Sequence, residues 1–308
     1  MAGGTRERLR SADAIKTYRY LRIGMVGAVV LLGAAIGWER WQVGRLGRAC
    51  LQTSISAYYY TPVRAAFVGS LMVIGFALIM IKGRRSYEDI CLNVAGMFAP
   101  VVAIVPTGDL GVFTTGTGAS EATVPRCRPS TLLSEDGRIP ADVIVSIVGN
   151  NFRALLIAGS LGLAVALVIA LFVNRGVNNA MAAVGTGTTV SLLVTAGALA
   201  LGWILISVWD SFPTQAHTPA AVLMFVALTL AVAGKATDHR RDANRTLFRL
   251  YTIVAVAMSA GGIAIQVFQL GRDHTTFLLE AWEIGLFAAF WVIQTAENWD
   301  EEVALAPA

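Results

Sequence analysis

Charged residues are scarce in this chain. Asp, Glu, Lys and Arg make up only 14% of its 308 residues, whereas hydrophobic residues make up 56%. A soluble domain of this length would have a smaller apolar share, and about a quarter of its residues would be charged. The composition therefore excludes a soluble globular protein and indicates an integral-membrane protein that crosses the bilayer several times.

Established catalytic motifs are also lacking. The sequence has no H-E-x-x-H or H-x-x-x-H pair and no G-x-S-x-G nucleophile motif. The glycine-rich stretch that begins at Gly185 has no P-loop lysine, so it does not predict a phosphate-binding loop. We therefore predict no cofactor, and a non-catalytic role is favoured over an enzyme.

Apolar runs dominate what is present. A helix needs about 20 apolar residues to cross a bilayer, and eight runs come close to this length. The predicted fold class is all-α, a polytopic membrane bundle of about eight transmembrane helices. The predicted spans are Leu21 to Trp38, Ala65 to Ile81, Ile90 to Val105, Ala154 to Val173, Thr188 to Val208, Ala220 to Ala236, Leu250 to Leu270 and Phe277 to Thr295.

The net charge of +4 has a topological interpretation and does not require a nucleic-acid partner. Membrane proteins retain Lys and Arg in their cytoplasmic loops. With eight spans, the basic clusters in 6–22, 82–85 and 235–249 fall on the same side as both termini, and 209–219 on the other side has no Lys or Arg. Both termini are therefore predicted to be cytoplasmic.

This topology gives one domain with two flanking segments. We expect a basic cytoplasmic N-terminal segment (1–20), a single transmembrane domain (21–295) and a cytoplasmic tail (296–308). Long outer loops are expected at 39–60 and 107–139. The predicted location is a membrane that the chain crosses several times.

Local signals predict where individual helices begin. Thr61 and Pro62 are typical of an N-cap and a first helical turn, and Ser86 with Asp89 forms a capping-box pattern. Pro140 and Asp142 predict a helix that runs without a break into the fourth span and projects beyond the bilayer. The run 58–60 consists of three tyrosines, whose rings we expect at headgroup depth.

Three cysteines are separated by the predicted topology. Cys50 and Cys127 fall in the two long outer loops, where the compartment is oxidising, and Cys91 falls at the inner end of the third span. Two interpretations of the outer pair stay open, a Cys50 to Cys127 disulfide and two separate thiols, because the sequence does not give the distance between their Cβ atoms.

Ionisable residues gather at the outer ends of the last four spans. Imidazoles and carboxylates meeting there would suit a divalent metal or a proton relay. Interfacial anchoring is the favoured interpretation, because charged residues are ordinary at span ends and no metal-ligand spacing is present. The candidate metal ligands are Asp210, His217, Asp273, His274 and Glu280.

A second group of polar residues predicts a ligand pocket on the outer face. If these side chains face inward, they form a site for a small ligand or a lipid headgroup; hydrogen bonds between helices are the alternative. The candidate pocket residues are Asn150, Asn151, Arg153, Gln266 and Glu283.

The stretch from Ser54 to Thr107 resembles uncharacterised bacterial integral-membrane proteins, commonly actinobacterial. Its S-I-S, three aromatics and T-P-x-R are followed by a phenylalanine and glycines in the next span and by a closing P-T. It is more distantly similar to domain-of-unknown-function, autophagy-modulator and GPI-anchor-remodelling membrane families. The resemblance implies a helical bundle and no active site.

Three functional hypotheses follow. The leading one is a non-catalytic membrane protein that binds lipid, a small ligand or a partner through the outer-face pocket. Its predicted partners are membrane lipids, and another membrane protein or a second copy of this chain. The alternatives are a small-solute or ion transporter and a metal-dependent membrane hydrolase.

Overall fold

The computed structural model describes residues 2–45, 51–83, 85–107, 141–173, 186–242 and 244–299, and in these residues it contains helices and no strand. The elements are α1 (Ala2–Arg45), η1 (Ser56–Tyr60), α2 (Arg64–Met80), α3 (Ser86–Ile104), α4 (Ala141–Val173), α6 (Thr186–Val208), α7 (Phe212–Gln215), α8 (His217–Arg241), α9 (Arg245–Val256), η2 (Ala257–Gly261), α10 (Gly262–Val267), η3 (Arg272–His274) and α11 (Thr275–Glu297).

Several predictions fall outside the described residues. Cys50 and Cys127 lie there, as do 108–139 of the second outer loop and 300–308 of the tail. The one cysteine that the structure describes, Cys91, is a free thiol.

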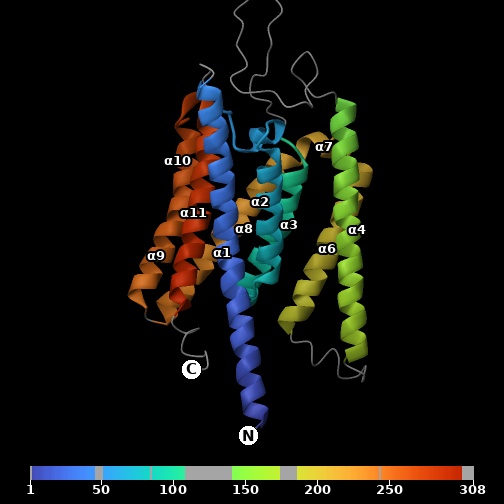
Figure 1. Cartoon of the computed structure of the whole chain (residues 1–308), viewed down its shortest axis with the longest axis vertical. Coiled ribbons are helices and arrows are strands. Elements are labelled where there is room, and N and C mark those ends of the chain that lie inside the picture. Colours follow the sequence, from blue (N-terminus) through green and yellow to red (C-terminus); the bar gives the residue numbers. More distant parts are fainter. Residues whose placement is uncertain are drawn as a thin grey trace, which may run out of the picture.

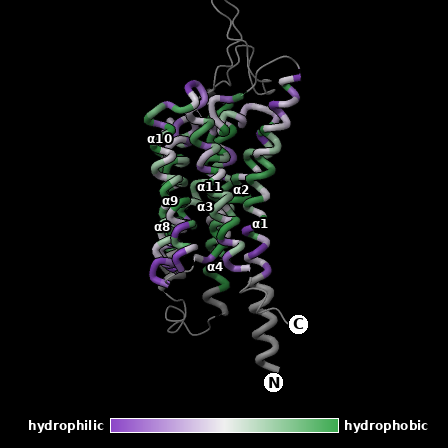
Figure 2. The backbone as a smooth tube through the Cα atoms, turned by 90° about the vertical axis from the view of Figure 1, so that its left-hand side faces the viewer, coloured by the Kyte–Doolittle hydropathy of each residue, from purple (hydrophilic) through white to green (hydrophobic). Residues whose placement is uncertain are grey.

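The predicted all-α fold is confirmed. Six of the described helices are long and apolar enough to cross a membrane, and two further apolar segments, Arg64–Met80 and Leu192–Val208, are shorter. Figure 2 shows hydrophobic residues along the middle of the bundle and hydrophilic residues gathered toward the helix ends. Large apolar side chains such as Val30, Leu161 and Ile253 are exposed on the outside, as expected for a surface that contacts lipid.

The bundle has a main body and a peripheral pair of helices. In the main body, α1, α2, α3, α8, α9 and α11 share one apolar core around Tyr58, Leu78, Leu92 and Trp291. The pair α4 and α6 stands to one side (Figure 1). It is joined to the body through a second, smaller apolar cluster near α7, which contains Phe152 and Phe212 with ring centroids 4.7 Å apart.

Helix α4 confirms the predicted uninterrupted start. It runs for 33 residues from Ala141, with Asp142 in its first turn. At 1.5 Å per residue it is about 50 Å long, compared with a hydrocarbon core of about 30 Å. The helix is therefore long enough to project beyond the bilayer.

Other helix boundaries differ from the sequence-based expectation. Val63, and not Thr61, is the N-cap of α2; the Thr61 hydroxyl instead donates to Tyr58 O at 2.9 Å and closes the turn before the helix. Ser86 is already inside α3, whose N-cap is Arg85. The capping-box prediction is wrong because the Asp89 carboxylate accepts a hydrogen bond from the Gly83 amide at 3.2 Å instead.

The predicted seventh span is not a regular helix. It divides into α9 and α10, joined by the π-helical segment η2. This segment contains Ser259 and Gly261, and small residues of this kind tolerate a local change of helical register. The π turn is a feature that the apolar run itself does not predict.

Candidate functional site

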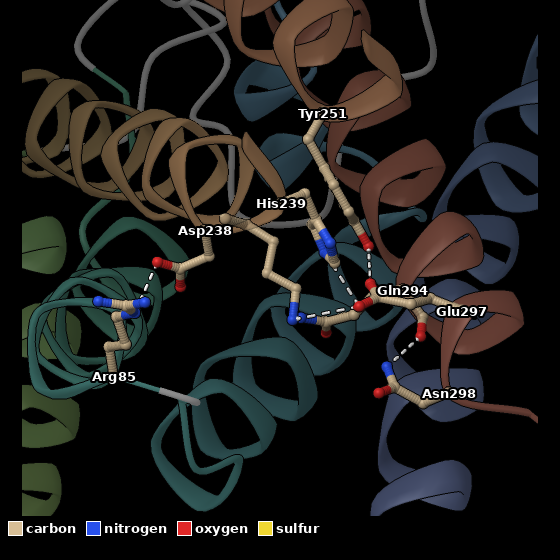
Figure 3. Close-up of polar contacts among 8 residues, drawn as sticks. Arg85, Asp238, His239, Tyr251, Gln294, Glu297 and Asn298 are labelled. Carbon is tan, nitrogen blue, oxygen red and sulfur yellow. Dashed lines mark hydrogen bonds and ion pairs between the residues drawn. The ribbon is translucent and has the colours of Figure 1, made fainter. Parts of the chain in front are cut away.

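A cluster of buried charged side chains lies at the end of the bundle where α8 and α11 finish (Figure 3). Its centre is the Glu297 carboxylate. Tyr251 Oη donates to Glu297 Oε2 at 2.5 Å. His239 Nε2 lies 3.0 Å from Glu297 Oε1, and Lys235 Nζ lies 3.7 Å from the same oxygen.

The positions of these residues follow from helix geometry. Lys235 and His239 are four residues apart on α8 and therefore share a face. Tyr251 on α9 is fully buried, and its ring stacks on the His239 imidazole with centroids 5.3 Å apart. Three helices thus meet at one carboxylate.

A second ion pair extends the cluster to α3. Arg85 Nε lies 2.6 Å from Asp238 Oδ1, and the Asp238 side chain is only 1% exposed. Tyr87 crosses from α3 to α8, where its ring lies directly over Gly234. Gln294 is also buried beside Glu297, and its backbone carbonyl accepts a hydrogen bond from Asn298 at the end of α11.

The electrostatics of the cluster explain its composition. An unpaired charge inside a membrane protein is costly, so buried ions are found in pairs and are supported by hydrogen bonds. Lys235 is 5% exposed and Glu297 is 11% exposed, so each charge is compensated mainly by the other and not by water. The arrangement can hold α3, α8, α9 and α11 together at this end of the bundle. Its carboxylate, imidazole and phenol are also groups that bind protons.

Sequence reasoning missed this cluster. Lys235 was interpreted as a topology signal, and His239 and Glu297 were given no role. A usable signal was present, because Lys235 and His239 lie on the same helical face as buried Ala231 and Leu228. A basic pair that continues an apolar stripe needs an acidic partner from another helix.

The opposite end of the bundle is closed by the segment from Gln52 to Thr61. Ser56 donates from its hydroxyl to Glu280 Oε1 at 2.7 Å and from its amide to Oε2 at 3.1 Å. The three tyrosines of η1 are buried in the protein at this end of the bundle, between 0% and 3% exposed. Their position at headgroup depth stays a prediction. Burial raises the pKa of Tyr60, so its neutral hydroxyl donates to Thr107 O at 2.7 Å.

The candidate metal ligands have separate surroundings. His217 is buried and its Nδ1 lies 2.7 Å from Val105 O, while Glu280 is bonded to Ser56. Asp210 and Asp273 are exposed, and His274 ends η3. Among the described residues, no group of three or more His, Cys, Asp or Glu side chains could hold a metal ion.

The candidate pocket residues are not brought together. Asn150, Asn151 and Arg153 are exposed on α4, which stands on the side of the bundle opposite α10 and α11 (Figure 1). Gln266 on α10 is exposed, and Glu283 on α11 is buried. The outer face therefore does not gather these five side chains into one site.

An apolar cleft lies between the main body and the α4–α6 pair. Its volume is about 360 Å³, within the range of ligand pockets in proteins. Apart from Thr195 and the indole of Trp209, its lining is apolar side chains and glycine. Lining residues include Phe98, Val101, Phe152, Leu156, Ala198, Gly202 and Leu205.

The cleft is open toward the outside of the bundle. Phe76, Leu201 and Leu223 line it and are 46%, 51% and 47% exposed. Two glycines of its lining let α4 and α6 approach each other closely: a Cβ at Gly159 would lie 2.8 Å from Leu199 Cδ2, and one at Gly202 would lie 2.7 Å from Leu156 Cδ2. The cleft therefore offers a long apolar molecule an entrance from the side of the helices.

Comparisons of the chain with models of known protein families, with curated proteins and with solved structures found no match.

Proposed function

We propose that this chain is a non-catalytic integral-membrane protein that binds lipid acyl chains in the cleft between its main body and the α4–α6 pair. The observation that carries the proposal is the apolar lining of a laterally open cleft of about 360 Å³. In this proposal lipid binds at the side of the bundle and not in an outer-face pocket.

The chemistry of the lining supports a hydrocarbon ligand. An apolar cleft provides too few hydrogen-bonding partners to hold ordered water. Each CH₂ group that leaves water for such a surface contributes about 0.8 kcal/mol, but a chain already in the membrane gains mainly close packing. We therefore expect selectivity for chain shape and length more than for the headgroup.

The setting that we propose is the cytoplasmic membrane of a bacterium, with eight crossings. The six long apolar helices support a membrane location, and α2 and the 192–208 segment would supply the other two crossings. An even number agrees with α1 beginning and α11 ending at the same end of the bundle (Figure 1). By the distribution of Lys and Arg, that end is cytoplasmic.

The hydrolase alternative gains no support from the described residues. Such an enzyme would need metal ligands at its outer face, and the described His, Cys, Asp and Glu side chains form no group of that kind. The binding proposal requires no such group.

Photocrosslinking tests the proposal. The full-length protein would be reconstituted with a phospholipid that carries a diazirine in its acyl chain, and crosslinked peptides would be identified by mass spectrometry. We expect crosslinks on α3 and α6 residues that line the cleft. Ala198→Trp fills the cleft and should reduce these crosslinks several-fold.

Leu193→Trp is the matched control, since Leu193 is on the same helix, is 67% exposed and does not line the cleft. It should leave the cleft crosslinks unchanged. If Ala198→Trp folds normally and crosslinks as strongly as the wild type, the chain does not bind lipid in this cleft.

A further inference from the structure

Glu283 is a buried carboxyl, about one helical turn from Glu280 on α11, with an unusual neighbour. It lies on α11, is 6% exposed and contacts the backbone of α10. A Cβ at Gly262 would lie 2.8 Å from Glu283 Oε1, so only glycine leaves the carboxyl its present place. The side chain is therefore held between two helices and away from water.

Glu283 has no polar partner among the described residues. Its Oε2 is fully buried and accepts no hydrogen bond, and no ion pair reaches either oxygen. The other two carboxylates of α11 differ in this respect. Glu280 accepts two hydrogen bonds from Ser56, and Glu297 is surrounded by a phenol, an imidazole and an ammonium group.

Charged and titratable groups are also present on the elements packed around α11. Those described on α1, α8, α9 and η3 form no ion pair with Glu283, and α10 has no charged residue. From residue 16 onward they are Lys16, Arg19, Arg22, Glu39, Arg40 and Arg45 on α1; His217, Lys235, Asp238, His239, Arg240 and Arg241 on α8; Arg245 and Arg249 on α9; and Arg272, Asp273 and His274 in η3.

The segment facing Glu283 is the π turn. Trp282, the residue before it, donates from its indole Nε1 to Ala257 O in η2 at 2.8 Å. A Cβ at Gly261 would lie 2.6 Å from that same nitrogen. Trp282 thus contacts both ends of η2, and Glu283 lies against Gly262, the first residue after it. π turns are frequent at functional sites.

We propose that Glu283 is a proton-binding site inside the helical bundle. The carboxyl is a neutral acid where α10 packs on α11, and it releases its proton in alkaline buffer. An ionised carboxylate without a counter-charge is too costly at such a buried position, whereas the neutral acid is tolerated. The proposal concerns a site and a ligand different from the lipid cleft.

Infrared spectroscopy of the reconstituted full-length protein tests this proposal. Spectra would be recorded from acidic to alkaline buffer for the wild type, Glu283→Gln and Glu280→Gln. We expect a protonated-carboxyl C=O band that disappears at alkaline pH, that Glu283→Gln removes and that Glu280→Gln retains.

Labelling with dicyclohexylcarbodiimide gives an independent readout of the same site. A protonated carboxylic acid adds across the carbodiimide, and acyl transfer to nitrogen leaves a stable N-acylurea that contains the whole reagent. Labelling of Glu283 that declines as the pH rises supports the proposal. The proposal is overturned if Glu283→Gln, correctly folded, removes no protonated-acid band, or if that band does not change with pH.

Discussion

Glu297→Gln is expected to be among the most destabilising conservative substitutions in this chain. The amide can still accept the Tyr251 hydrogen bond, but it leaves the Lys235 ammonium, which is 5% exposed, without a carboxylate. Removing one partner of a buried ion pair costs about 3–5 kcal/mol, because the remaining charge is neither hydrated nor neutralised. We expect a loss in the lower part of that range, since Glu297 itself is 11% exposed.

A double variant that carries both Glu297→Gln and Lys235→Met separates the effect of charge burial on stability from the effect of packing. Lys235→Met alone should cost less than Glu297→Gln, because His239 remains within 3.0 Å of the carboxylate. When both residues are replaced, no unpaired charge is left, so the double variant should be more stable than the sum of the single losses predicts. Lys82→Ala is the control: Lys82 lies 3.5 Å from Asp89 and is 56% exposed, and the Asp89 carboxylate, which is 9% exposed, keeps its hydrogen bond from the Gly83 amide. Its loss should therefore cost about 0–1 kcal/mol.

Unfolding of the purified protein in mixed micelles, titrated with a denaturing detergent, measures these differences. The expected order of destabilisation is Glu297→Gln, then Lys235→Met, then Lys82→Ala. If Glu297→Gln is as stable as Lys82→Ala, or if the double variant loses the full sum of the single effects, the cluster is hydrated and the reasoning from burial is refuted.

Two further predictions concern packing and topology. Gly234→Ala places a Cβ 2.0 Å from Tyr87 Cε2 and should lower the thermal unfolding temperature. Gly69→Ala is the control, because a Cβ there would have no atom within 4 Å, and it should leave the unfolding temperature unchanged or slightly higher. Equal effects of the two substitutions would contradict the contact between Gly234 and Tyr87. A cytoplasmic-activity reporter fused after Trp299 should be active, and a periplasmic-activity reporter there should be inactive. The reverse result would overturn the proposed orientation.

The sequence predicts the helices well because membrane solubility constrains each segment separately. A run such as Ala220 to Ala236 must satisfy its own backbone hydrogen bonds in lipid, and this requirement is visible without knowing its neighbours. The same holds for α4, whose uninterrupted start follows from Pro140 and Asp142.

Contacts between helices are less visible, because an apolar run does not reveal which face is buried. The meeting of Lys235 with Glu297 joins residues from α8 and α11, and nothing local to either helix fixes their relative rotation. The burial of the η1 tyrosines is not visible in the sequence for a related reason. An aromatic run suits both the headgroup region and a buried cap, and the Thr61 turn directs this one inward.

The candidate pocket residues also show that sequence patterns do not predict contacts between helices. Asn150 and Gln266 are both polar residues near predicted outer ends, but the order of helices around the bundle places α4 and α10 on opposite sides (Figure 1). That order depends on how all the helices pack together. A search of single segments for polar residues cannot recover it.

The attachment of α4 and α6 through one aromatic cluster has a mechanical consequence. The main body is fastened by ionic contacts at one end and by the Ser56 to Glu280 contact at the other, whereas the pair is fastened to it mainly around Phe152 and Phe212. We therefore expect a local change in bilayer thickness to tilt the pair relative to the body more than it deforms the body itself. The width of the cleft would then follow the thickness of the membrane around it.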